Sequence, residues 1–171
     1  MKIKYILLLI PLSLVTVLLG CWYYSTSGST LPPHIKTVAV PLAENETLEY
    51  GIETTLTDAV IAAFVSDNTL RVVDRKAADS LIKVKVVDVK DEPLTYSAEK
   101  TGEKAQEYRL SIQVQICHLD LRKDTKLWEE KLLEGWGAYQ APGEPEQRAE
   151  GIDAAAKMLA SEILQRTVAG W

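Results

Sequence analysis

The sequence is poor in the side chains on which catalytic, metal and disulfide sites are usually built. Its 171 residues include two cysteines, two histidines and a single phenylalanine. It contains no glycine-rich phosphate loop, no nucleophile elbow and no zinc-ligand spacing. His118 directly follows Cys117, but adjacent residues of a strand point to opposite faces of a sheet, so these two cannot bind one metal ion together. We therefore expect no enzymatic activity, no cofactor and no metal.

Positive charge is also scarce. The chain has 19 lysines and arginines against 24 acidic residues, which gives a formal net charge of −5. Residues 1–20 hold two lysines and no acidic residue, so a chain without them has a charge of −7. Because nucleic-acid binding requires a concentrated basic surface, the composition predicts no nucleic-acid partner.

A hydrophobic run long enough to cross a membrane is missing too. The apolar stretch from about Ile6 to Leu19 contains Pro11 and falls short of the roughly 20 residues that a membrane-spanning helix needs. Two lysines precede it, which is the layout of a secretory signal. We expect residues 1–20 to be a signal peptide.

The apolar run ends in Leu18-Leu19-Gly20-Cys21, which resembles the bacterial lipobox. The resemblance implies that Cys21 is acylated and becomes the first residue of the mature chain, the alternatives being an ordinary export signal or a free thiol. Each buried methylene contributes about 0.8 kcal/mol, so two or three acyl chains anchor a protein firmly where one holds it only marginally. Trp22, rather than Asp, follows the cysteine, which in bacteria that sort lipoproteins indicates the outer membrane.

Residues 21–33 are rich in serine, glycine and proline, and we expect them to form a lipidated tether on the periplasmic side. Acylation of Cys21 would leave only Cys117, so an intramolecular disulfide is not expected. Cys117 is interpreted as a small, partly buried hydrophobic residue.

Residues 34–171 are sufficient for a single domain with its own core. Their hydrophobic periodicity predicts strands at 34–41, 70–73, 80–90, 107–121 and 127–136, and helices at 47–67 and 146–168. The apolar positions of these elements that are expected to face the core include Leu56, Val60 and Phe64 in the first helix, Leu110, Ile112, Val114 and Ile116 in the fourth strand, and Ala149, Leu159 and Ile163 in the second helix. Asn45 or Thr47 is expected to cap the first helix. A bulge is expected near 87–89, a charged turn at 122–126 and a break at 141–145. Pro93, Gly102 and scattered charges predict a mobile loop at 91–106.

This order of elements predicts an α/β (α+β) two-layer sandwich, with two amphipathic helices packed on one face of a small mixed β-sheet. Gly135 and Gly137 are expected to mark the end of the last strand. Trp128 and Trp136 are an even number of residues apart, which predicts that both lie on one face of that strand, more often as core than as a contact surface.

The basic side chains of the predicted sheet gather at two places. Lys83 and Lys85 lie on the outward face of one strand, and Arg122, Lys123 and Lys126 lie at a hairpin tip. Such cations can hold phosphate groups through charge-assisted hydrogen bonds. The plainer interpretation is that they solvate the surface and protect strand edges from pairing. We keep these five residues as candidate contacts for an anionic ligand.

Several segments are distinctive when taken in their order along the chain. They are Gly20-Cys-Trp-Tyr-Tyr-Ser, Leu31-Pro-Pro-His-Ile-Lys-Thr-Val-Ala-Val-Pro41, Asn45-Glu-Thr-Leu-Glu-Tyr-Gly51, Leu70-Arg-Val-Val-Asp-Arg75 with Ala78-Asp79, Leu127-Trp-Glu-Glu130 and Gly135-Trp-Gly137. Together they resemble the LptE family of lipopolysaccharide-assembly lipoproteins. The resemblance implies an outer-membrane lipoprotein that is the plug and folding partner of an LptD-type β-barrel and helps to deliver lipopolysaccharide to the outer leaflet. It also implies the two-layer fold expected above.

A second hypothesis is a self-assembling secretion-pore lipoprotein similar to CsgG, which also combines a lipobox with a Val-Ala-Val strand and an Arg-Val-Val-Asp-Arg segment. Such a pore needs alternating membrane-crossing strands of about ten residues each. Residues 80–136 offer three candidates, but interruptions and charges weaken them.

Overall fold

The computed structural model describes residues 31–99, 102–140 and 145–169. Their elements, in chain order, are β1 (Thr37–Ala39), β2 (Glu44–Asn45), α2 (Ile52–Asp67), β3 (Arg71–Val72), the 3₁₀ turn η2 (Arg75–Ala77), β4 (Ser80–Glu99), β5 (Gly102–Asp120), β6 (Thr125–Gln140) and α3 (Pro145–Val168). The expected signal peptide, residues 1–20, lies outside the described residues, and so do the first four residues of the predicted break at 141–145.

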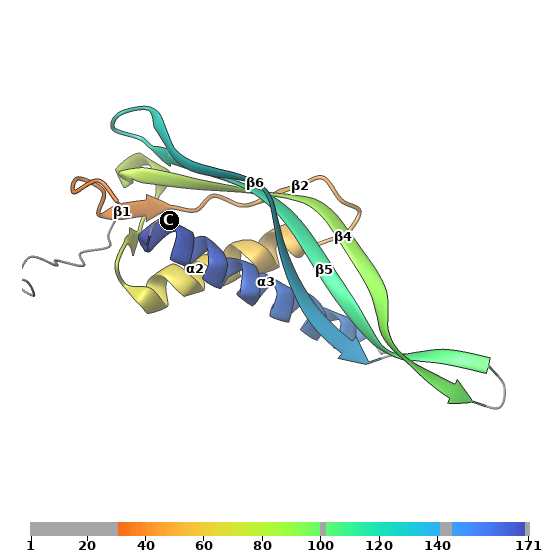
Figure 1. Cartoon of the computed structure of the whole chain (residues 1–171). Helices are drawn as coiled ribbons and strands as arrows, with labels where there is room; N and C mark the ends of the chain where they lie inside the picture. The colour runs from red at the N-terminus through yellow and green to blue at the C-terminus, as the bar shows by residue number, and fades with distance from the viewer. Residues whose placement is uncertain (1–30, 100–101, 141–144, 170–171) are drawn as a thin grey trace, which may run out of the picture.

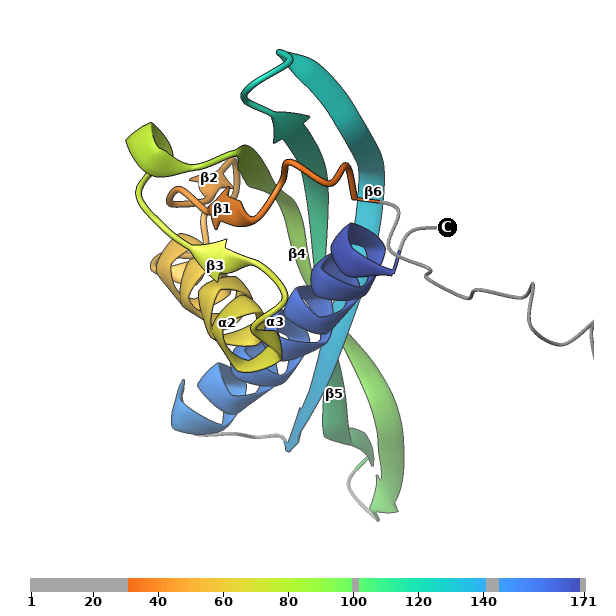
Figure 2. The same ribbon diagram turned by 90° about the vertical axis from the view of Figure 1, so that its left-hand side faces the viewer.

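The six strands form one mixed sheet in the order β3-β1-β4-β5-β6, with β2 paired separately to β4. β1 runs parallel to β3 and β4, whereas β4, β5 and β6 are antiparallel. Both helices lie on the same side of the sheet (Figure 1 and Figure 2). The predicted two-layer α/β sandwich is therefore confirmed.

The core lies between the helices and the sheet, where the predicted apolar stripes meet. Both helices and β5 contribute side chains with at most 2 % of their surface exposed: Leu56, Val60 and Phe64 of α2, Leu159, Ala160 and Ile163 of α3, and Leu110, Ile112, Val114 and Ile116 of β5. Each fully buried large apolar side chain contributes about 1.5–3 kcal/mol. Ala149, expected on the buried stripe of α3, is exposed instead.

Two glycines allow α3 to pack directly on the backbone of β6. A Cβ atom added at Gly135 would lie 2.5 Å from Leu159 Cγ, and one added at Gly137 would collide with the carbonyl oxygen of Gly151. The prediction that these glycines end the strand is wrong, because β6 continues to Gln140. Glycine is required at positions 135 and 137 because α3 leaves no room for a Cβ atom.

The segment 91–106 is a two-stranded ribbon and not the expected loop. β4 continues to Glu99 and β5 begins at Gly102, so the hairpin extends past the helices (Figure 1). Pro93, a reason for predicting a loop, sits beside a register shift. Pro93 pairs with Tyr108 next to this irregularity, and a strand tolerates a proline at such a place. The bulge expected near 87–89 is confirmed by the register shift between Val86 and Asp88.

The first helix starts later than predicted. Its N-cap is Gly51, with a φ of 83° and no side-chain cap. Asn45, proposed as a cap, instead accepts hydrogen bonds from the backbone N–H and the hydroxyl group of Thr47. Residues 46–51 therefore form a loop between β2 and α2, and a glycine tolerates the left-handed conformation at its end.

The two tryptophans of β6 lie on opposite faces of the sheet. A register shift at Gln115 gives β6 one extra residue, and an extra residue reverses the face of every side chain beyond it. Trp128 pairs with His118 on the helix side, whereas Trp136 pairs with Ser111 on the other side and is 43 % exposed. The prediction that they share one face is therefore wrong.

Candidate functional site

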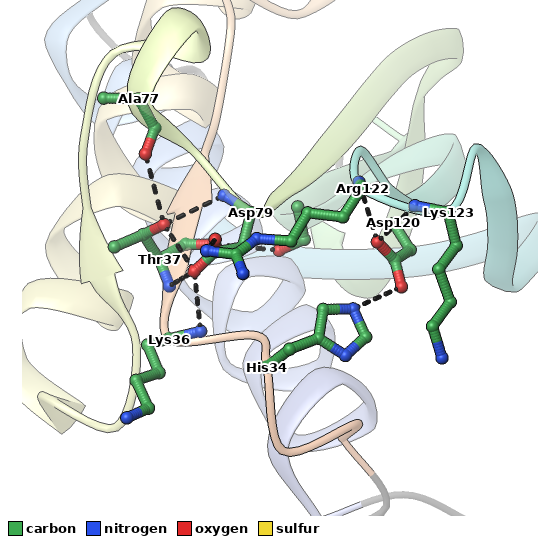
Figure 3. Close-up of polar contacts among 9 residues, drawn as sticks. His34, Lys36, Thr37, Ala77, Asp79, Asp120, Arg122 and Lys123 are labelled. Atoms are coloured by element: carbon green, nitrogen blue, oxygen red, sulfur yellow. Dashed lines mark hydrogen bonds and ion pairs between the residues drawn. The ribbon is translucent and has the colours of Figure 1, made fainter.

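A polar cluster holds the hairpin between β5 and β6 against the start of the domain (Figure 3). Its first carboxylate, Asp79, accepts hydrogen bonds from the backbone N–H groups of Lys36 and Thr37 at 3.0 and 3.1 Å, and from the Thr37 hydroxyl at 2.9 Å. Arg122 lies 2.6 Å from its other oxygen. Since these donors favour the charged form, with the Lys36 N–H the largest influence, the pKa of Asp79 falls to about 2.

The second carboxylate of the cluster is Asp120, which is buried at the end of β5. It accepts hydrogen bonds from the backbone N–H groups of Arg122 and Lys123 and lies 2.7 Å from His34 Nε2. Burial by itself would raise the pKa of Asp120, but the hydrogen bonds from Lys123, His34 and Arg122 outweigh it, and the pKa is lowered. The hairpin tip is thereby fixed beside residues 34–37, where the domain begins.

The five candidate cations differ in how much of their charge is already compensated. Arg122 pairs with Asp79, Lys126 pairs with Glu129 at 2.6 Å, and Lys85 lies 2.9 Å from Glu46. Hydrogen bonds to these glutamates raise the pKa of both lysines. Within the described part of the chain, the ammonium groups of Lys83 and Lys123 form no ion pair. Those two therefore have the most charge to offer an anion.

The structure brings Lys83 and Lys85 together on the face of the sheet opposite the helices. They line a depression of about 350 Å³ together with eight further residues, among them Gln115, Cys117, Glu129 and Lys131. Lys126, through its pairing with Glu129, extends this surface toward the hairpin tip. We call this region, defined by Lys83, Lys85, Lys126 and Lys131, the lysine face.

Sequence reasoning missed Lys131 and the exposed position of Trp136. Lys131 lies at the extra residue of β6, where simple alternation no longer tells which way a side chain points. Further along the same face, the Arg109 guanidinium stacks 5.1 Å from the centre of the Trp136 ring and also pairs with Glu134 at 3.0 Å. No sequence signal identified this arrangement, because it depends on the register between β5 and β6.

The residues considered as metal ligands do not form a site. His118 is fully buried, and burial lowers its pKa to about 4, so its ring is neutral at pH 7. Cys117 is partly buried, as expected, and points to the opposite face. In residues 31–99, 102–140 and 145–169, no three His, Cys, Asp or Glu side chains are grouped to hold a metal ion.

Other expectations fall outside the described residues. Cys21, the expected lipidation site, and the tether up to residue 30 belong to this group. Among the helices that the structure does describe, none combines the length and the apolar character needed to cross a membrane.

Comparison with known proteins gives one family match. The LptE family, described as lipopolysaccharide-assembly, matches residues 35–167. No curated protein matches the chain.

Solved structures share the fold at low sequence identity. A protein from Xanthomonas campestris has a TM-score of 0.57 at 10 % identity and covers 80 % of this chain and 88 % of its own. A lipoprotein candidate from Caulobacter crescentus has a TM-score of 0.52 at 14 % identity, covering 78 % and 89 %. A PelC dodecamer from Paraburkholderia phytofirmans has a TM-score of 0.50 at 13 % identity, covering 81 % and 92 %.

Proposed function

The chain belongs to the LptE family of lipopolysaccharide-assembly proteins, and from that premise we propose that it is the plug and folding partner of an LptD-type β-barrel in the outer membrane. The single observation that carries this proposal is the extent of the family match, which spans residues 35–167 and therefore almost the whole described body. In this role the protein acts by binding and not by catalysis.

The lysine face supports contact with lipopolysaccharide. Phosphate groups of such a ligand are anionic, and ammonium groups bind them through charge-assisted hydrogen bonds. Lys83, Lys85 and Lys131 line one depression, and Lys126 is joined to it through its hydrogen bond to Glu129. Arg122 should contribute less to ligand binding, because its guanidinium already pairs with the buried Asp79 carboxylate.

The place of the protein on the periplasmic side of the outer membrane rests on acylation of Cys21. The polar cluster around Asp79 and Asp120 suits such an anchor, because it fixes residues 34–37 to the sheet where a tether would enter. The barrel lumen is a polar environment, which suits a body that presents charged side chains on its outer sheet face.

A ring-forming pore lipoprotein is the second candidate function. The likeness to a PelC dodecamer favours it, since that protein has a similar fold and assembles from twelve copies. Against it, the three long strands bury their apolar side chains under α2 and α3, so they are not available to face lipid.

Co-purification tests the proposal. The full-length protein, solubilised from envelopes in detergent, should recover one large barrel protein and should incorporate radiolabelled palmitate, which Cys21→Ser should abolish. Recovery of identical subunits alone would favour the pore. Equal palmitate labelling of wild type and Cys21→Ser would contradict the anchor.

A further inference from the structure

The loop between β2 and α2 displays two apolar side chains completely to solvent. Leu48 has a relative exposure of 104 % and Tyr50 one of 97 %, the highest among the large hydrophobic residues whose side chains the structure describes. Residues 46–51 will be called the Leu48 loop. Scattered exposed apolar residues are ordinary on protein surfaces, so exposure alone assigns no role to them.

The Leu48 loop is rigidly built, which makes the exposure informative. Asn45 Oδ1 accepts hydrogen bonds from the backbone N–H and hydroxyl of Thr47 at 2.9 and 2.7 Å, and Asn45 Nδ2 donates to the carbonyl oxygen of Glu49 at 2.8 Å. The Thr47 hydroxyl in turn accepts a bond from the Glu49 N–H. Pre-organisation of this kind lowers the entropic cost of binding.

An ion-pair network fastens the Leu48 loop to the rest of the domain. Arg148 of α3 donates two parallel hydrogen bonds to the Glu49 carboxylate, both of 2.9 Å. The same guanidinium lies 3.0 Å from Asp91 of β4, which also accepts a hydrogen bond from the Tyr139 hydroxyl of β6. The loop is therefore positioned by a helix and two strands that are distant in sequence.

A depression of about 350 Å³ adjoins the loop, between it and the first half of α3. Its lining includes Tyr50, Ile52, Thr55, Arg148 and Ile152. Tyr50 thus stands at the rim of a concave surface. A projecting aromatic residue beside a recess is the arrangement found at the centre of many protein interfaces, where tyrosine is enriched among residues that dominate binding.

The charge around the loop identifies the kind of surface that fits it. Glu44, Glu46, Glu49 and Glu53 lie within ten residues of sequence. Two cations face them: Lys85 pairs with Glu44 and Glu46, and Arg148 pairs with Glu49. An anionic lipid surface would be repelled, since interfacial segments are typically basic. A second copy is disfavoured by the net charge of −5. A protein surface with an apolar recess and a basic rim is complementary.

We propose that the Leu48 loop is a docking surface for a partner protein, with Leu48 and Tyr50 entering an apolar recess rimmed by basic side chains. The proposal rests on the function proposed above and places the recess on the barrel. It assigns barrel contact to this loop and leaves the lysine face to the anionic ligand.

The test compares two double variants of the full-length lipoprotein by co-purification from detergent-solubilised envelopes. Leu48→Ser/Tyr50→Ser removes the loop side chains, and Val65→Ser/Met158→Ser removes exposed apolar side chains of the helix layer, which are 63 % and 45 % exposed. We expect barrel recovery to fall at least about tenfold for the first variant and to stay within about twofold of wild type for the second. Both should melt within a few degrees of wild type, because the replaced side chains are exposed.

The outcomes separate the two proposals. If the wild-type protein recovers no barrel, the proposed function fails. If wild type and the loop variant recover it equally, or if the helix-layer variant loses it to the same degree, only the docking proposal is overturned. Crosslinking from a photoreactive amino acid at position 48, in an otherwise native chain, is a second and independent measurement. It should form an adduct with the barrel, whereas an adduct only with another copy or with lipid would overturn the proposal.

Discussion

The two faces of the sheet differ in what they do for the protein. The helix face buries side chains such as Ile112 and Ile116 completely and lets α3 approach so closely that only glycine fits at two positions of β6. The opposite face carries lysines, a stacked Arg109 and the half-exposed Trp136. Stability is therefore concentrated on one face, which leaves the other able to carry charge for binding.

The largest effect should come from filling the contact between α3 and β6. Gly137→Val places a side chain where the carbonyl oxygen of Gly151 lies, so the helix must move. We expect a loss of about 3 kcal/mol or more in the free energy of unfolding, measured in urea. Trp136→Ser, the neighbouring residue on the other face, is the control and should cost less, about 1–2 kcal/mol, because this side chain is already 43 % exposed. Equal losses would mean that the faces are not energetically distinct.

The second-largest effect should come from Asp79, the carboxylate of the polar cluster that precedes β4. Asp79→Asn should lower the free energy of unfolding by about 2 kcal/mol. The Lys36 and Thr37 groups that now donate hydrogen bonds to a charged carboxylate would then donate to a neutral amide. The pKa of Asp79 is below its ordinary value of 3.8, so its stabilisation is present above that pH and lost as the pH falls toward about 2.

The wild-type protein should therefore lose more stability than Asp79→Asn when urea unfolding is compared between about pH 4.5 and pH 2.5. Parallel pH profiles for the two proteins would show that the carboxylate is not held in its charged form by the fold.

Charge reversal on the lysine face should affect binding rather than folding. We expect Lys83→Glu/Lys131→Glu to weaken the binding of purified lipopolysaccharide at least about tenfold, with the unfolding free energy changed by less than about 0.5 kcal/mol. Lys123→Glu tests the hairpin tip separately. Arg122→Glu is unsuitable for this purpose because it also breaks the pair with Asp79. Unchanged binding would leave these lysines as solubilising charges.

The smallest effect should come from the ion pair between Lys126 and Glu129. Both side chains are nearly half exposed, and exposed pairs contribute little. Glu129→Gln should change the melting temperature by less than about 2 °C. It should nevertheless strengthen lipopolysaccharide binding slightly, since it releases the Lys126 charge; weaker binding would argue that Glu129 itself contacts the ligand.

Regular periodicity explains what the sequence predicted well. The alternation along β5 identified its buried side chains, and the helical stripes identified Leu56 and Leu159 as core. The alternation along the first part of β4 placed Lys83 and Lys85 on the outer face. These features follow from local geometry, with a period of 2.0 in strands and 3.6 in helices.

The features that were missed depend on pairing between distant segments. The β6 bulge, which turns Trp128 and Trp136 to opposite faces, exists only in register with β5. The ribbon at 91–106 is held by the pairing of β4 with β5, which overrides the loop signal of Pro93. The late start of α2 had a usable signal in Gly51, whose positive φ separates the Leu48 loop from the helix.

Native mass spectrometry of the detergent-solubilised full-length protein tests the central claim most directly. The account predicts a complex with one copy of this chain, carrying the mass of its acyl groups, and one copy of a β-barrel protein. A complex built only from several copies of this chain, or a chain without added lipid mass, would contradict it.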